Sequence, residues 1–115
     1  MKILGIDPGL VQTGYGIITI YNNDPQIVDY GVVKPTVNDE FSTRLLTIFE
    51  DVSEIINMHK PSIFSIEDVF YGKNVKSTLR LGQARGAAMV SAASTGLSIH
   101  EYSARKIKQA VTGNG

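Results

Sequence analysis

Cysteine is absent from the 115 residues, and histidine occurs only at His59 and His100. Without cysteine the chain has no disulfide framework and no thiolate that could bind a metal or attack a substrate. The two histidines form no ligand-spaced cluster, which argues against a zinc site. No run of about 18 apolar residues occurs, so the sequence predicts no membrane-spanning segment. It also opens without a charged-then-apolar signal segment, and we therefore expect a cytoplasmic protein.

The net charge of zero conceals an asymmetry between the two halves of the chain. Residues 1–59 carry three basic and eight acidic side chains, a net charge of −5, whereas residues 60–115 carry eight basic and three acidic ones, a net charge of +5. A basic half suits a polyanionic partner such as nucleic acid. Because many proteins without such a partner show a similar asymmetry, charge alone leaves the partner open.

The chain is long enough for one domain around one core, and 43% of its residues are hydrophobic. Hydrophobic patterning predicts an α/β fold with the element order β-β-β-α-β-α-β-α. Short, turn-rich links join the first three strands into an antiparallel meander, and the later alternation of strand and helix implies parallel crossovers in a mixed sheet. Asn38 or Asp39 is expected to cap the first helix, which Pro61 follows. The predicted strands are residues 2–7, 13–21, 26–33, 62–67 and 97–102, and the later helices are residues 75–95 and 103–111.

The predicted helix of residues 75–95 contains many small side chains, among them Gly82 and Gly86. Each glycine inside a helix costs about 1 kcal/mol relative to alanine. We expect close backbone approach to offset this cost. The pattern predicts a central helix pressed between the sheet and another helix, from this chain or from a second subunit.

Asp7 and Glu67 each end a predicted strand. Strand alternation places Asp7 on one face with Gly5, and Glu67 on one face with Ser65. If the two strands are parallel neighbours, both carboxylates project from one rim of the sheet, where open α/β sheets place their chemistry. Two close carboxylates repel, so one is protonated or a divalent cation bridges them. Hard oxygen ligands favour Mg²⁺, with Mn²⁺ as a substitute, and such a site suits phosphodiester cleavage. The alternative is two unrelated acids at strand ends.

The loop after Glu67 combines aromatic and basic side chains, which is typical of a contact with unpaired bases. In the simpler interpretation, Phe70 anchors the loop on the core. A further basic cluster near the end of the chain binds phosphates or forms a solvated face. The candidate DNA-binding residues are Phe70, Tyr71, Lys73, Asn74, Lys76, Arg80, Arg105 and Lys108.

The opening strand and turn also resemble the start of actin-like sugar and acetate kinases. There Gly9, Gly14 and Gly16 would approach phosphates. That family needs a second phosphate loop and an adenosine site, for which 115 residues leave too little room.

Four motifs together resemble the RuvC Holliday-junction resolvases across essentially the whole chain. They are Gly5-Ile6-Asp7-Pro8-Gly9 with Thr13-Gly14-Tyr15-Gly16, Ile66-Glu67-Asp68-Val69-Phe70 with Lys73-Asn74, Leu81-Gly82-Gln83-Ala84-Arg85-Gly86, and Glu101-Tyr102-Ser103-Ala104-Arg105-Lys106-Ile107-Lys108-Gln109. The resemblance implies an RNase H-like fold and a homodimer that cuts four-way DNA junctions symmetrically. It also implies a branch-migration helicase complex as a partner. It also implies that Asp7 and Glu67 are Mg²⁺-binding catalytic acids, that Phe70 stacks at the opened junction, and that Lys108 lies near the scissile phosphate.

The remaining catalytic acids of the resembled family lie on a later helix, and no acid follows Glu101 here. We therefore expect residues 1–115 to form a single nuclease domain that lacks its C-terminal portion. On its own, this polypeptide would cleave junctions weakly or not at all. The two main hypotheses are a structure-selective endonuclease and a module that binds branched DNA without cutting it.

Overall fold

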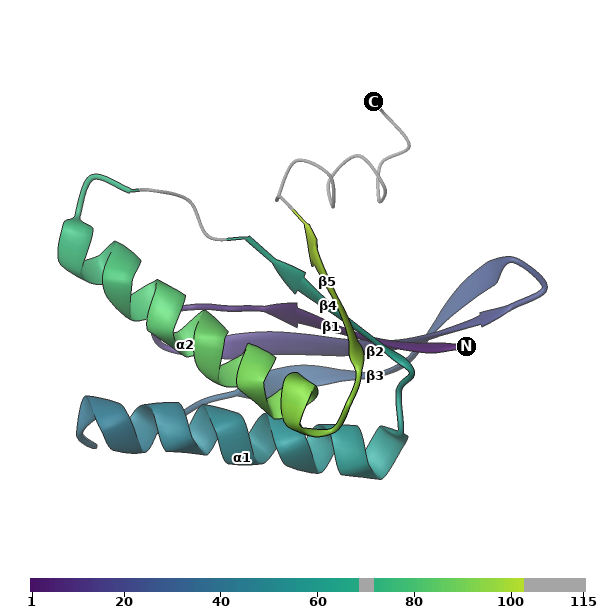
Figure 1. Cartoon of the computed structure of the whole chain (residues 1–115), viewed down its shortest axis with the longest axis horizontal. Helices are drawn as coiled ribbons and strands as arrows, with labels where there is room; N and C mark the ends of the chain where they lie inside the picture. Colours follow the sequence, from purple (N-terminus) through teal and green to yellow (C-terminus); the bar gives the residue numbers. More distant parts are fainter. Residues whose placement is uncertain (69–71, 103–115) are drawn as a thin grey trace.

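The computed structural model describes residues 1–68 and 72–102 and has an α/β fold (Figure 1). A five-stranded sheet has the strand order β3-β2-β1-β4-β5. The first three strands pair antiparallel, whereas β1 with β4 and β4 with β5 pair parallel, which confirms the predicted mixed sheet. The predicted helix of residues 103–111 lies outside the described residues. The elements are β1 (Lys2–Asp7), β2 (Thr13–Tyr21), β3 (Asp24–Val33), α1 (Phe41–His59), β4 (Ile63–Glu67), α2 (Val75–Ser94) and β5 (Ser98–Tyr102).

The ends of several elements differ slightly from the prediction. β3 begins at Asp24, because Asn22 and Asn23 alone make the turn, with φ angles of 51° and 63°. Asparagine tolerates this left-handed conformation better than most residues. The predicted cap of α1 at Asn38 or Asp39 is wrong: Glu40 occupies the N-cap and makes no side-chain capping hydrogen bond.

Both helices lie on the same face of the sheet, and the hydrophobic core fills the space between (Figure 1). The strands contribute Leu4, Ile6, Ile17, Val33, Phe64 and Ile66, α1 contributes Ile48, Val52 and Ile56, and α2 contributes Ala84, Ala88 and Ala92. The alanines are small, so α2 packs close to the sheet and to α1. Neither α1 nor α2, the helices within the described residues, has the length and hydrophobicity needed to cross a membrane.

The explanation predicted for Gly82 and Gly86 is wrong within this chain. A Cβ atom added at either position would meet no atom of the described residues within 4 Å. The small residues that do pack closely are the alanines on the sheet side of α2, three of which are fully buried or nearly so. The two glycines lie on another side of the helix, because the 3.6-residue repeat separates them from these alanines.

Candidate active site

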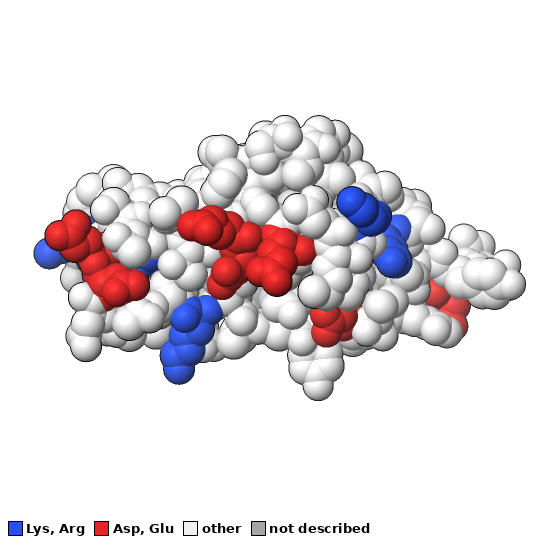
Figure 2. All heavy atoms as spheres, turned by 90° about the horizontal axis from the view of Figure 1, so that it is seen from below, with Lys and Arg blue, Asp and Glu red and all other residues white. Residues whose placement is uncertain are grey.

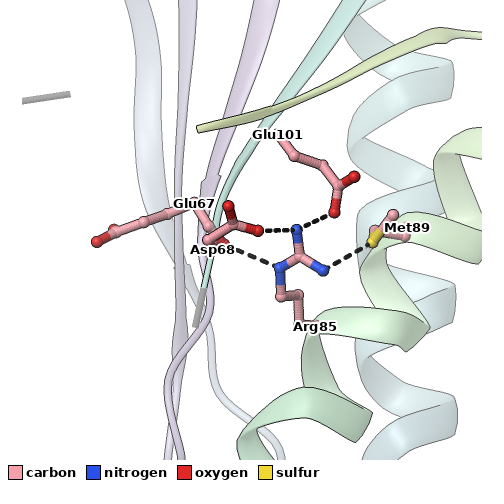
Figure 3. Close-up of polar contacts among 5 residues, drawn as sticks. All are labelled: Glu67, Asp68, Arg85, Met89 and Glu101. Atoms are coloured by element: carbon pink, nitrogen blue, oxygen red, sulfur yellow. Dashed lines mark hydrogen bonds and ion pairs between the residues drawn. The ribbon is translucent and has the colours of Figure 1, made fainter. Parts of the chain in front are cut away.

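Asp7 and Glu67 end neighbouring strands at the same rim of the sheet. β1 and β4 run parallel, with Gly5 aligned with Ser65 and Ile6 with Ile66. The next aligned positions are therefore Asp7 and Glu67. Both acids line one hollow of about 470 Å³. Figure 3 shows the Glu67 side chain pointing away from the helices, so this hollow lies on the sheet face that α1 and α2 leave open.

The two carboxyl groups influence each other directly. Burial raises the pKa of Glu67, and Asp7 raises this pKa further, first as a hydrogen-bonding partner and then as a negative charge. Two carboxylates in contact either share a proton or bind a cation between them. Their hard oxygen atoms fit a divalent cation such as Mg²⁺. Across residues 1–68 and 72–102, no group of three or more acidic, histidine or cysteine ligands occurs.

Small residues keep the hollow open beside the two acids. Gly5, Gly14, Gly16 and Ser65 all contribute to its lining. A Cβ atom at Gly14 would lie 3.8 Å from the Cβ of Asp7, and a Cβ atom at Gly16 would meet no described atom within 4 Å. Larger side chains on these strands would project toward the carboxylates, so these positions preserve space for a ligand.

The turn after Asp7 is tightly constrained. A Cβ atom at Gly9 would lie only 2.2 Å from the main-chain oxygen of Gln12, so no other residue fits without moving the backbone. Arg44 of α1 donates a hydrogen bond from Nη2 to the main-chain oxygen of Leu10 at 3.0 Å. This contact fixes the turn to the helix layer and with it the direction in which the chain leaves Asp7.

Comparison with known proteins identifies the family. Residues 3–115 match the family described as crossover junction endodeoxyribonuclease RuvC. A RuvC of that description from Citrifermentans bemidjiense is 50% identical over 115 residues, which are all of this chain and 70% of that protein. The chain belongs to the RuvC family. Its family is therefore one of endodeoxyribonucleases.

Solved structures of related proteins share the fold. The Thermus thermophilus RuvC in complex with a Holliday junction substrate superposes with a TM-score of 0.89 at 25% sequence identity, covering 97% of this chain and 72% of that one. The yeast mitochondrial Holliday junction resolvase Ydc2 matches with a TM-score of 0.66 at 13% identity, covering 97% of this chain and 63% of that one, which shows the fold alone. The mixed sheet with its helices is thus the RNase H-like fold of RuvC.

The structure places four of the eight predicted DNA-binding residues. Lys73 and Lys76 are exposed at the start of α2 and form no ion pair with any described residue. Asn74 caps α2, because its Oδ1 accepts a hydrogen bond from the Ser77 N–H at 3.0 Å. The capping bond occupies the acceptor atom of Asn74, so this residue has a structural role that the sequence analysis did not assign.

Arg80, the fourth of these residues, also has a structural contact. Its guanidinium lies 4.5 Å from the centre of the Phe41 ring, at the start of α1. This cation–π contact ties α2 to α1. The other four predicted residues, Phe70, Tyr71, Arg105 and Lys108, lie outside the described residues.

On the face of the molecule that carries α1, acidic side chains outnumber basic ones (Figure 2). Seen from below in Figure 2, acidic side chains gather in a central patch, and basic ones are fewer. α1 contains Glu50, Asp51 and Glu54, and the last two line a depression together with Asp29. Because phosphates are repelled by such a surface, this face is unsuited to the DNA backbone.

One residue near the site has a role that its sequence motif did not indicate. Arg85 of α2 donates a hydrogen bond from Nε to the main-chain oxygen of Glu67 at 3.0 Å (Figure 3). Its signals in the sequence are its place in the motif Leu81-Gly82-Gln83-Ala84-Arg85-Gly86 and its position on a helix whose small residues indicate close packing. A cation at such a position needs an anionic or carbonyl partner.

Proposed function

We propose that this RuvC-family chain acts on four-way DNA junctions and hydrolyses phosphodiesters through a divalent cation, Mg²⁺ in the cell, held by Asp7 and Glu67. The observation that carries this proposal is the placement of two carboxylates at the aligned ends of adjacent parallel strands, where both line one open hollow at the rim of the sheet. The junction substrate named for the Thermus thermophilus relative supports the choice of DNA.

The two acids have distinct tasks in this proposal. Asp7 and Glu67 would hold the cation through their carboxylate oxygens, and a bound cation would favour the charged form of Glu67, whose pKa burial and Asp7 raise. When bound there, the cation would supply activation of a water molecule and stabilisation of the leaving oxygen. Gly14 and Gly16 leave room beside the acids for the scissile phosphate.

A polypeptide of residues 1–115 is expected to cleave weakly or not at all. Only two carboxylates, Asp7 and Glu67, line the hollow among the described residues, and two-metal nucleases need more ligands than this pair provides. The relative from Citrifermentans bemidjiense is longer, since the match covers 70% of it. We propose that residues 1–115 form one nuclease domain whose active site is incomplete on its own.

DNA contacts are proposed for the basic start of α2. Lys73 and Lys76 are exposed there, in the segment that follows β4 and its catalytic acid. Arg80 contacts the Phe41 ring and donates no hydrogen bond to any of the described residues, and we propose that its guanidinium also reaches a phosphate. Phe70, Tyr71, Asn74, Arg105 and Lys108 remain predicted DNA contacts.

A homodimer is proposed through the outward face of α2. Val75, Leu79 and Val90 are 54%, 63% and 57% exposed, and Gly82 and Gly86 fall on the same side of the helix. An exposed stripe of apolar and small residues suits another helix at close range. A two-fold dimer also fits a junction with near two-fold symmetry. The helicase complex stays a prediction from the resemblance.

The test is a binding and cleavage assay with a labelled four-way junction and a linear duplex of the same sequence. We expect the chain to bind the junction more tightly than the duplex, and any Mg²⁺-dependent cleavage to disappear in Asp7→Asn. Equal affinity for both DNAs would refute junction selectivity. Cleavage that survives Asp7→Asn would refute the assigned site.

The second candidate function is a module that binds branched DNA without cutting it. It is favoured by the presence of only two carboxylates in the described site. Junction binding that is unchanged by Asp7→Asn, with no cleavage at any Mg²⁺ concentration, would support this function for the polypeptide of residues 1–115. Robust Mg²⁺-dependent cleavage by that polypeptide would contradict it.

A further inference from the structure

The main-chain oxygen of Glu67, at the end of β4, has no hydrogen-bond donor on the neighbouring strand. The N–H of Asp68 donates to a carbonyl of β5, so the main-chain groups of Glu67 point toward the other neighbour, β1. In the parallel register, which aligns Ile6 with Ile66, the residue of β1 that would donate to the Glu67 oxygen is Pro8. Proline has no N–H, so this oxygen needs a donor from outside the sheet.

Arg85 supplies that donor and binds two carboxylates as well (Figure 3). Its Nε donates to the Glu67 main-chain oxygen at 3.0 Å, and its Nη2 donates to Oδ1 of Asp68 at 2.9 Å. Nη2 also forms an ion pair with the Glu101 carboxylate. The remaining Nη1 lies 3.3 Å from Sδ of Met89. One planar guanidinium thus joins the ends of β4 and β5 to α2.

The burial of Arg85 indicates that this arrangement is specific. Its side chain is only 14% exposed, whereas those of Asp68 and Glu101 are 52% and 50% exposed. A nearly buried cation is retained where hydrogen bonds and charges compensate its lost hydration. The fork geometry of arginine serves several acceptors at once, which the point charge of lysine does not.

We propose that Arg85 is a positioning residue for the active site. It holds the backbone of β4 at Glu67 from the helix side of the sheet, so that the Glu67 carboxylate stays beside that of Asp7 on the open side. Without Arg85, the last residue of β4 loses its hydrogen bond, and Asp68 and Glu101 repel each other across the vacated position. This inference rests on the proposed role of Asp7 and Glu67 as a cation-binding pair.

The test compares three variants of the full chain with the wild type. Arg85→Met removes the donor, and Gln83→Met makes a matched change at an exposed position of the same helix. The triple variant Arg85→Met/Asp68→Asn/Glu101→Gln removes the donor without leaving two facing charges, which protects the fold. Circular dichroism checks folding, the ¹³C resonance of the Glu67 carbonyl is measured without metal, and the Mn²⁺ dissociation constant is measured by calorimetry.

We expect the Glu67 carbonyl resonance to shift and the Mn²⁺ dissociation constant to rise about tenfold in Arg85→Met and in the folded triple variant, as for other residues that orient metal ligands. Gln83→Met should match the wild type in both measurements. A folded triple variant with wild-type Mn²⁺ affinity, or an unmoved carbonyl resonance, would overturn the proposal. If Asp7 and Glu67 do not bind a cation together, Asp7→Asn will bind Mn²⁺ as tightly as the wild type. In that case the carbonyl resonance, which is measured without metal, still tests whether Arg85 positions Glu67.

Discussion

At the scale of single residues, the contact between Asp7 and Glu67 costs the fold some stability when no cation is present. Burial, together with the hydrogen bond and charge of Asp7, raises the pKa of Glu67 above its usual value. The folded state therefore holds this proton more tightly than the unfolded state does, and stability is lost as pH rises through the interval between the two pKa values. A site that binds a cation tolerates such a cost because the cation removes it.

Glu67→Gln should therefore stabilise the metal-free protein at neutral pH. The gain should vanish below about pH 4, where the carboxyl group is protonated in both states. Urea unfolding in EDTA, at neutral pH and below about pH 4, measures the difference in unfolding free energy between Glu67→Gln and the wild type. Glu50→Gln on the exposed side of α1 controls for the loss of one negative charge. A Glu67→Gln protein no more stable than the wild type at pH 7 would show that the two carboxyl groups do not strain the fold.

Gly9→Ala tests the turn that follows Asp7. The added Cβ atom would lie 2.2 Å from the Gln12 oxygen, so the backbone must shift. Overpacking of this kind costs about 1–3 kcal/mol in unfolding free energy. Gly16→Ala, whose Cβ meets no described atom within 4 Å, provides the control for urea unfolding. Equal stability of the two variants would mean that the turn relaxes freely.

At the scale of secondary-structure elements, α2 serves two neighbours. Its buried side carries Ala84, Ala88 and Ala92 against the core, and its Arg85 reaches the end of β4. Its outward stripe, defined by Val75, Leu79, Gly82, Gly86 and Val90, faces away from the described chain. α2 would thus lie between a second subunit bound to this stripe and Glu67 at the end of β4.

Leu79→Glu should disrupt the proposed homodimer. A charge placed in an apolar helix contact loses its hydration without gaining a partner, and the dimer dissociation constant should rise at least about tenfold. Sedimentation velocity measures this change. Met58→Glu on α1, which replaces a side chain that is 68% exposed, is the matched control. A monomeric wild type, or a Leu79→Glu protein that dimerises normally, would contradict the assigned contact.

The elements also show why some features followed from the sequence and others did not. The pairing of Asp7 with Glu67 was predictable because crossovers make their strands parallel, and alternation then fixes the face of each side chain. The sequence did not show whether this chain or a second subunit covers Gly82 and Gly86, because a helical glycine shows neither which side it faces nor what covers it; no described atom of this chain does. Arg85 was missed because its partners are distant in sequence and meet only when α2 packs over β4 and β5.

At the scale of the whole molecule, the charge asymmetry of the sequence has a spatial counterpart. The α1 face is acidic (Figure 2), whereas the exposed Lys73 and Lys76 lie at the start of α2 after the strand that carries Glu67. If Lys73 and Lys76 contact DNA as proposed, such an arrangement would direct a polyanion to the start of α2 and away from the α1 face.

Substitution of these lysines should change the salt dependence of DNA binding. If each lysine neutralises one phosphate, Lys73→Gln or Lys76→Gln should lower the slope of log affinity against log salt by about one, with a similar weakening for junction and duplex. Fluorescence anisotropy over a range of salt concentrations measures the slope. Lys60→Gln, at the far end of α1, should leave it unchanged. An unaltered slope in both lysine variants would remove the start of α2 from the DNA interface.

Binding of Mn²⁺ to the wild type, Asp7→Asn and Glu67→Gln, measured by calorimetry at neutral pH, tests the central claim most directly. If the two carboxylates hold one cation together, either substitution should weaken Mn²⁺ binding by about tenfold or more. The double variant Asp7→Asn/Glu67→Gln should bind Mn²⁺ only slightly more weakly than either single variant. Equal Mn²⁺ affinity in the wild type and both single variants would contradict the claim that Asp7 and Glu67 form a metal site.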